Sequence, residues 1–183
     1  MLDTPLNVEG FFFEYFSASS LAMSSKDGLG KCVDAVIKTF IAENTVYLEL
    51  RSSPKVGTDY DVVGYYTTII EKCKEYEGKF PVRLIISLNR GIPDLHFYDD
   101  LLTQIQKVPD WQKYIVGLDL SGDPYVKEFS DFVPLINGAK AIGLKITLHT
   151  SEVEPHFKEV PEVFAVRPNR IGHFNYFTEK ELI

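Results

Sequence analysis

Three residues, His149, Glu152 and His173, have the types and spacing that suit metal-assisted hydrolysis. His149 ends the apolar run 144–149, and a histidine there can bind Zn²⁺ through a neutral imidazole nitrogen. Glu152 lies three residues later, where it can exchange a proton between a water molecule and a substrate without binding the ion. His173 ends the next short apolar run, where it can orient a water molecule or fill a polar site. The alternative for the first pair is a hydrogen-bonded core histidine and a helix-capping glutamate.

Polar or glycine-containing segments also follow the other apolar runs. Because ligands of parallel sheets bind beyond the carboxyl ends of the strands, these segments are the place to look for a site. Their spread over five strand ends favours the mouth of a barrel. The sequence has no GxGxxG, no P-loop and no GxSxG motif, which weakens nucleotide-cradling and serine-nucleophile alternatives. The segments contain Glu49 and 51–55, Asn89 to Gly91, and Asp119 with 121–124.

The strands that must position these residues are short, β-branched, apolar runs. They lie at 46–50, 82–88, 114–120 and 144–149, with a weaker fifth run at 170–172. Spacings of roughly 25 to 36 residues between runs are typical of strand–helix–strand units with parallel pairing. The pattern predicts an α/β fold with a buried parallel sheet, either an open doubly wound sheet or a closed barrel.

The segments between the strands carry apolar residues at helical spacing, with stripes at 32–41, 62–73, 95–105 and 129–139. Asp59 or Asp61 is available to cap the second helix. Pro134 and Gly138 are expected to weaken or kink the fourth, and Gly143 suits a helix-ending left-handed position.

Composition limits the remaining classes. The chain has 183 residues and a formal net charge of −7, which argues against binding to nucleic acid. No apolar run reaches the roughly 20 residues needed to cross a bilayer, and no signal peptide is recognisable. The two cysteines, Cys32 and Cys73, are expected to be buried and reduced, which favours a cytoplasmic protein. His96 and His156 are expected to be exposed and without a role.

Four motifs, YLELRSSPK, GLDLSGDP, LKITLHTSE and RIGHF, occur in this order along the chain. Together they resemble the adenosine/AMP deaminase superfamily, and in particular the adenosine-deaminase-like proteins of the N6-methyl-AMP deaminase type. The resemblance covers about residues 30 to 175. It implies a (β/α)8 TIM-type barrel and a zinc-dependent hydrolytic deamination at C6 of an adenine nucleoside or mononucleotide, such as N6-methyl-AMP to IMP.

The resemblance also implies roles for individual residues. His149 matches a zinc ligand, Glu152 matches the proton donor to the purine ring, and His173 matches the histidine that orients the zinc-bound hydroxide. Gly122 matches the glycine whose backbone N–H contacts the purine. The substrate-contacting positions also include Ser52, Ser53, Pro54, Lys55, which could face a phosphate, and Asn89, where the deaminase-like subgroup often has Asp. We expect His149, Glu152 and His173 to cluster, with Gly122 and Asp119 alongside.

The sequence departs from the family pattern at both ends. The family's first strand carries an H-x-H pair of zinc ligands and its last an Asp pair, and neither was found. By the resemblance, residues 1–183 form a single incomplete barrel domain with strands two to six and an incomplete site for one Zn²⁺. We therefore expect this chain to be inactive alone. The alternative is a non-catalytic product that retains part of a purine pocket or binds a partner through exposed sheet edges. The complete enzyme is expected to be a monomer, and this chain could self-associate.

Overall fold

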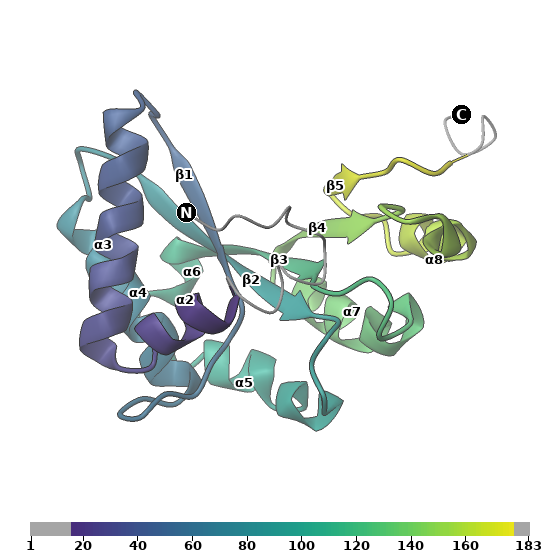
Figure 1. Cartoon of the computed structure of the whole chain (residues 1–183), viewed down its shortest axis with the longest axis horizontal. Helices are drawn as coiled ribbons and strands as arrows, with labels where there is room; N and C mark the ends of the chain where they lie inside the picture. The colour runs from purple at the N-terminus through teal and green to yellow at the C-terminus, as the bar shows by residue number, and fades with distance from the viewer. Residues whose placement is uncertain (1–15, 178–183) are drawn as a thin grey trace, which may run out of the picture. The chain divides into compact units, whose positions relative to one another are not determined.

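The computed structural model drawn in Figure 1 describes residues 16–177. These residues fall into two compact units, of which the first comprises 16–48 and Lys55–Pro81 and the second comprises Glu49–Pro54 and 82–177. Each unit is built from segments that are distant in sequence, so the segment at 49–54 belongs with the C-terminal residues. None of the described helices is both long and apolar enough to span a membrane.

The first unit consists of the helices α2 (Phe16–Ala22), α3 (Lys26–Ala42) and α4 (Val62–Glu75), with α3 packed on α4. The buried line of α3 runs through Leu29, Val33 and Ile37 at intervals of four residues. The predicted stripe was therefore partly wrong, because Val36 and Ile41 are 39% and 41% exposed. Val36 lies off the four-residue repeat through Leu29, Val33 and Ile37, whereas Ile41 continues this repeat but lies in the last turn of α3.

Polar contacts fix the ends of these helices. The Asp61 carboxylate caps α4 and accepts a hydrogen bond of 2.7 Å from the Gly64 N–H, so Asp61 is the cap among the two candidates. Asp59 instead accepts from the backbone N–H of Lys26 at 2.9 Å. At the other end of α4 the Tyr76 hydroxyl donates to Asp34 of α3, at 2.5 Å, and this bond raises the pKa of Tyr76 to about 12.

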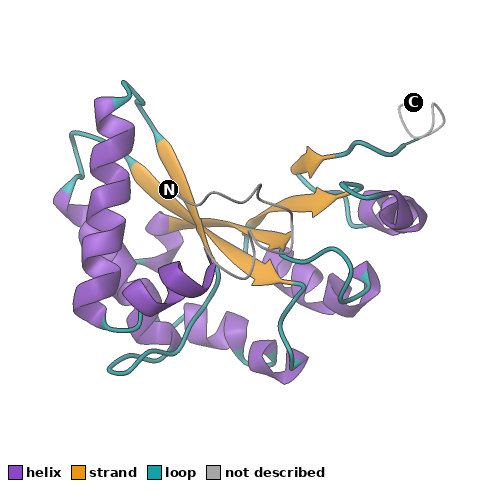
Figure 2. Ribbon diagram, viewed as in Figure 1, coloured by secondary structure: helices purple, strands orange, loops and turns teal. Residues whose placement is uncertain are grey.

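The second unit contains one five-stranded sheet (Figure 2). Its strands are β1 (Leu48–Ser52), β2 (Val82–Asn89), β3 (Ile115–Ser121), β4 (Lys145–Thr150) and β5 (Arg170–His173), and they lie in sequence order. β2 to β5 pair in parallel. A sequential order is that of a barrel wall, whereas the order of a doubly wound sheet reverses at a switch point. The predicted α/β fold with parallel strands, a partial TIM-type barrel, is confirmed, with β1 two residues later than expected.

One face of this sheet is apolar and packs against helices. Leu84, Ile86, Leu118, Ile146 and Leu148 point to this face and are buried. α6 (Trp111–Tyr114) packs on β2 and β3, and α7 (Val133–Ala141) packs on β3 and β4. The remaining described elements are η2 (Leu95–Tyr98), α5 (Leu101–Ile105), η3 (Phe129–Phe132), η4 (Glu154–Glu159) and α8 (Val160–Ala165).

The proline and glycines of the fourth predicted helix have specific places. Pro134 lies in the first turn of α7, where its missing N–H leaves no helical hydrogen bond unmade, and the helix predicted at 129–139 is divided just before it into η3 and α7. Gly138 lets Leu102 of α5 approach closely, because a Cβ at this position would lie 2.7 Å from Leu102 Cδ1. Gly143 has a φ of +92° and ends the helix in the left-handed conformation, as predicted.

Candidate active site

The second face of the sheet is lined by polar side chains. Ser87, Asp119 and Thr147 lie opposite one another in neighbouring strands, so their side chains point to the same face. All three are buried, although their strands read as continuous apolar runs. The Ser87 hydroxyl lies 3.3 Å from the Asp119 carboxylate and 2.6 Å from the Ser121 hydroxyl. Ser87 and Thr147 were not among the residues predicted from the sequence. Polar residues at alternate positions within an apolar strand could have indicated them.

His149 projects from β4 onto this face, two residues after Thr147. Its Nδ1 lies 3.0 Å from Oδ1 of Asp119, which is fully buried. A guanidinium nitrogen of Arg51 in β1 lies 3.5 Å from His149 Nε2. Because a carboxylate only accepts and a guanidinium only donates, neutral His149 carries its proton on Nδ1. Nε2 then keeps the lone pair that a metal ion would use.

The environment of His149 also sets its basicity. The hydrogen bond to Asp119 raises the pKa of His149 above its ordinary value, and burial and the Arg51 guanidinium partly offset this effect. The exposed His96 has a raised pKa for a similar reason, because Asp99 lies 2.9 Å from its Nδ1.

The Asp119→Asn variant is therefore expected to have a lower His149 pKa than the wild type. An amide cannot stabilise the imidazolium, whereas burial and Arg51 still oppose it. The measurement is an NMR titration of the histidine ring protons in metal-free protein. Asp99→Asn is the matched control and should lower the pKa of His96 alone. An unchanged His149 pKa in the Asp119 variant would contradict the assigned hydrogen bond.

Glu152 and His173 lie beside His149. Nε2 of His173 and a carboxylate oxygen of Glu152 are 3.1 Å apart, and the rings of His173 and His149 are separated by 5.3 Å between centroids. The expected clustering of these three residues is confirmed, and their catalytic roles stay predictions. In β4 and β5 the register pairs His149 with Gly172 and Thr150 with His173, which explains why both strand ends meet here.

The backbone turns sharply at both strand ends. Ser151 and His173 have φ angles of 52° and 62°, in the left-handed region that residues other than glycine seldom adopt. The Ser151 carbonyl accepts hydrogen bonds from the N–H groups of Asn175 and Tyr176, at 2.9 and 3.2 Å. These bonds hold the turn that leads from His149 to Glu152 against the turn that follows His173. Strained backbone of this kind is concentrated at functional sites.

Gly122 and Asn89 form a second group, at the ends of β3 and β2. Gly122 has a φ of +96°, and a Cβ there would lie 2.0 Å from the Asn89 side-chain oxygen. Only glycine fits this position. The same Asn89 oxygen accepts from the Gly91 N–H at 2.8 Å. The two residues are therefore brought together, and any contact of either with a substrate remains a prediction.

The remaining predicted residues run from Ser52, the last residue of β1, to Lys55, and they divide between the two units. In the second unit Ser52 and Ser53 are half-buried and Pro54 is buried. Lys55 belongs to the first unit, where its ammonium group donates to the Ser20 hydroxyl at 2.6 Å. Burial lowers the pKa of Lys55.

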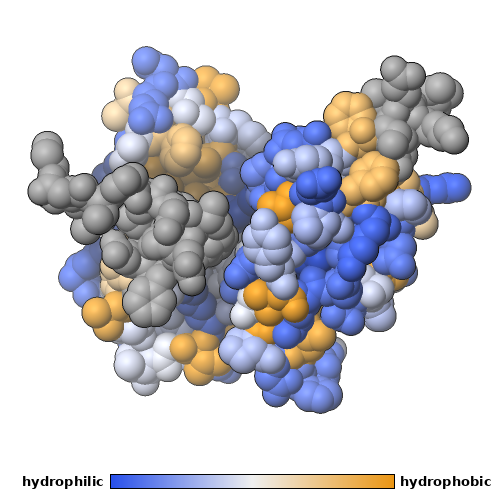
Figure 3. Space-filling view, turned by 45° about the vertical axis from the view of Figure 1, so that its right-hand side comes forward, coloured by the Kyte–Doolittle hydropathy of each residue, from blue (hydrophilic) through white to orange (hydrophobic). Residues whose placement is uncertain are grey.

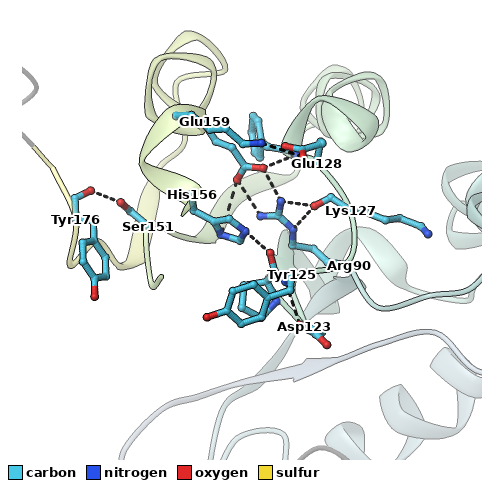
Figure 4. A network of polar contacts seen from close by, with 12 residues as sticks. Arg90, Asp123, Tyr125, Lys127, Glu128, Ser151, His156, Glu159 and Tyr176 are labelled. Carbon is cyan, nitrogen blue, oxygen red and sulfur yellow. Dashed lines mark hydrogen bonds and ion pairs between the residues drawn. The ribbon is translucent and has the colours of Figure 1, made fainter. Parts of the chain in front are cut away.

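A buried ionic cluster of Arg90, His156 and Glu159 corrects one prediction (Figure 4). His156 was expected to be exposed, but it is 5% exposed and its Nε2 contacts the Pro124 carbonyl. Close to it, Arg90 forms a two-pronged ion pair with Glu159, and these residues are 2% and 4% exposed. The sequence did not predict this burial, because the hydrogen-bond partners of His156 and Glu159 on other elements lie 30 or more residues away along the chain.

Apolar side chains also reach the surface of the second unit. Phe157, Phe164 and Phe177 are among the exposed large hydrophobic residues. Figure 3 shows orange side chains among blue ones next to the grey end of the chain. The surface there is mixed in polarity, and the polar face of the sheet remains the better candidate for chemistry.

Among the described residues, His149 has the surroundings expected of one ligand of a catalytic zinc ion. The Asp119 carboxylate bonds Nδ1 of His149, and metal-binding histidines are commonly oriented by such a hydrogen bond from the ring nitrogen that does not bind the metal. A catalytic zinc ion takes three protein ligands and a water molecule. Within residues 16–177, however, no three His, Cys, Asp or Glu side chains are grouped so that they could hold an ion. Binding at Nε2 would also require Arg51 to move away.

The family profile that matches this chain describes adenosine deaminases, and relatives of the chain are adenosine deaminase-like proteins and N6-methyl-AMP deaminases. The sequence profile described as "Adenosine deaminase" matches residues 3–181. The chain is 30% identical to the adenosine deaminase-like protein of Drosophila melanogaster, over 93% of this chain and 51% of that protein. It is 31% identical to the N6-methyl-AMP deaminase of Danio rerio, over 88% of this chain and 48% of the relative. The chain thus spans about half the length of the curated relatives it matches.

Solved structures agree with the fold. An Arabidopsis adenosine deaminase-like protein complexed with GMP superimposes with a TM-score of 0.77 and 29% identity, over 93% of this chain and 52% of that chain. A Burkholderia ambifaria amidohydrolase with bound Zn has a TM-score of 0.75 at 16% identity, over 91% and 46% of the two chains. At that identity the second likeness supports the barrel fold alone.

Proposed function

The chain belongs to the adenosine deaminase family, and we propose that its polar site serves the zinc-dependent hydrolytic deamination of an adenine mononucleotide. The reaction we expect is the conversion of N6-methyl-AMP to IMP, in which water attacks C6 and methylamine leaves. One observation carries the proposal: His149, Glu152 and His173 lie together at two neighbouring strand ends, with His149 held by a buried carboxylate.

The proposal gives each of these residues a distinct task. His149 would bind zinc through Nε2 while Asp119 holds its Nδ1–H. A zinc ion, when bound, would lower the pKa of a water molecule and so supply the nucleophile. Glu152 would donate a proton to the purine ring as C6 is attacked. His173, 3.1 Å from Glu152, would hold the attacking water in position.

The substrate class follows from the relatives and from the residues around the site. Several relatives are named N6-methyl-AMP deaminases, and a structural relative is complexed with GMP. The backbone N–H of Gly122 would contact the purine, and Asn89 and the segment 52–54 would line its pocket. Lys55 belongs to the other unit, where its ammonium group bonds Ser20, and its contact with a phosphate stays a prediction. A mononucleotide substrate and two free cysteines suit a cytoplasmic protein.

A second function is favoured by a specific observation. The absence of a three-residue metal group within residues 16–177 suits a chain that binds a purine mononucleotide without turning it over. This alternative keeps Gly122 and Asn89 as purine contacts and gives His149 and Glu152 no chemical task.

The experiment that separates the two measures three quantities on the purified 183-residue chain. Zinc content is determined by mass spectrometry, the affinity for IMP by calorimetry, and the release of methylamine from N6-methyl-AMP by NMR. Bound zinc together with turnover would support the deaminase and would contradict the expectation that this chain is inactive alone. Binding of IMP without zinc or turnover would support the alternative. A chain that neither binds IMP nor turns over N6-methyl-AMP would refute both.

A further inference from the structure

We infer that Arg90, Glu159 and His156 form a positioning network that holds Gly122 and Glu152 in place (Figure 4). The inference rests on the proposed function, because it concerns the same site. None of the three residues belongs to the polar cluster of His149. They act through the backbone of the loop 122–128 after β3 and through η4, which follows the turn 151–153 after β4.

Arg90 lies immediately after β2 and is the centre of the network. Its two terminal nitrogens donate to the two carboxylate oxygens of Glu159, at 3.0 and 2.6 Å. Nε and one terminal nitrogen also donate to the Lys127 carbonyl, at 3.0 and 2.5 Å. One planar guanidinium therefore binds both η4 and the loop 122–128, in an orientation that its fixed fork of donors determines.

Glu159 and His156 add two further contacts to the same loop. Glu159 accepts a hydrogen bond of 2.8 Å from the Phe129 N–H, directly after the loop. His156 contacts the Pro124 carbonyl through Nε2, which must be the donor because a carbonyl only accepts. Backbone groups at 124, 127 and 129 are thus all held by side chains from η4 and from Arg90, directly after β2.

These contacts lie close to the proposed purine and proton-donor residues. Gly122 precedes Pro124 by two residues, and the Arg90 N–H donates to the Ser121 carbonyl at 2.7 Å. Glu152 precedes the start of η4 by two residues. The network therefore ties the loop that begins at Gly122 to η4, the element that directly follows the segment carrying Glu152, and this loop cannot shift relative to η4 without breaking a buried hydrogen bond.

Stability alone is a weak reason for this arrangement. Apolar side chains of similar volume often stabilise a core as well as a buried ion pair does. An apolar pair, however, cannot donate to the Lys127 carbonyl or accept from Phe129, so it would leave the loop without directional contacts. Positioning is the property that the polar network supplies and an apolar one lacks.

The test compares variants of the full chain that keep the fold. Arg90→Met/Glu159→Leu removes both charges together and leaves no charge unpaired. His156→Leu removes one donor, and His156→Gln keeps a nitrogen donor at about the same distance from the backbone. Lys158→Ala, which breaks only the exposed pair with Glu128, is the matched control. Hydrogen exchange is followed by mass spectrometry, and IMP affinity by calorimetry.

In the double variant and in His156→Leu, amides of 122–129 and 151–156 should exchange at least about tenfold faster, with β2 and α7 unchanged. The affinity for IMP should fall about tenfold in the same variants. His156→Gln and Lys158→Ala should behave as the wild type. Faster exchange throughout the second unit, unchanged exchange in both loops, or unchanged IMP affinity despite faster exchange would overturn the inference. If the wild type does not bind IMP, the proposed function fails, and the exchange pattern still decides whether the network positions the loops.

Discussion

In a protein that contains the complete metal site, the Glu152→Gln substitution is expected to lower kcat for deamination of N6-methyl-AMP by about 10²–10⁴-fold, the range typical of a lost general acid. Glutamine keeps the size of the side chain and its place beside His173, but it has no carboxylic proton to donate. Zinc content and IMP affinity should stay near their wild-type values, because Glu152 is assigned neither to the metal nor to the purine contact. The measurements are the initial rate of methylamine release, bound zinc and calorimetric affinity.

Glu154→Gln provides the matched control, because it makes the same change two residues away at an exposed position. Its kcat should equal that of the wild type. A Glu152→Gln variant that kept more than about a tenth of the wild-type kcat would show that another group donates the proton. Loss of zinc from this variant would show instead that Glu152 is a ligand.

Replacing Glu159 with alanine is expected to lower the free energy of unfolding by roughly 3–5 kcal/mol. Arg90 is 2% exposed, so the variant would leave its charge buried without a counter-ion. The Phe129 N–H would lose its acceptor at the same time. Since small domains have only about 5–15 kcal/mol of net stability, a loss of this size should be visible as a large shift of the urea midpoint.

Two companion variants separate the possible causes. Glu128→Ala removes an exposed carboxylate that pairs with Lys158 and should leave the urea midpoint nearly unchanged. The Arg90→Met/Glu159→Leu double variant should recover most of the stability lost by Glu159→Ala, because it buries no unpaired charge. If Glu159→Ala unfolded at the wild-type midpoint, the ion pair would have to be open to water in solution.

The order of the elements and the residues at the strand ends could be predicted from the sequence. β2 and β4 were located to within a residue, since their apolar runs are continuous and bounded by polar residues. β1 was placed two residues too early, because Val46 and Tyr47 are as β-prone as the strand itself but lie exposed before it. Local composition indicates a strand, whereas the register with its neighbour decides where pairing begins.

The proximity of His149, Glu152 and His173 also followed from the sequence, because neighbouring parallel strands end at the same edge of a sheet. Which distant polar groups pair with one another was decided by the tertiary structure alone. Asp119 reaches His149 from the next strand, and Arg90 reaches Glu159 across 69 residues of chain. Periodicity reports which face of an element is apolar, but a pairing between distant side chains depends on how elements pack, to within about an ångström. Because the sequence does not give this packing, the burial of His156 could not be predicted from it, and the prediction of an exposed residue was wrong.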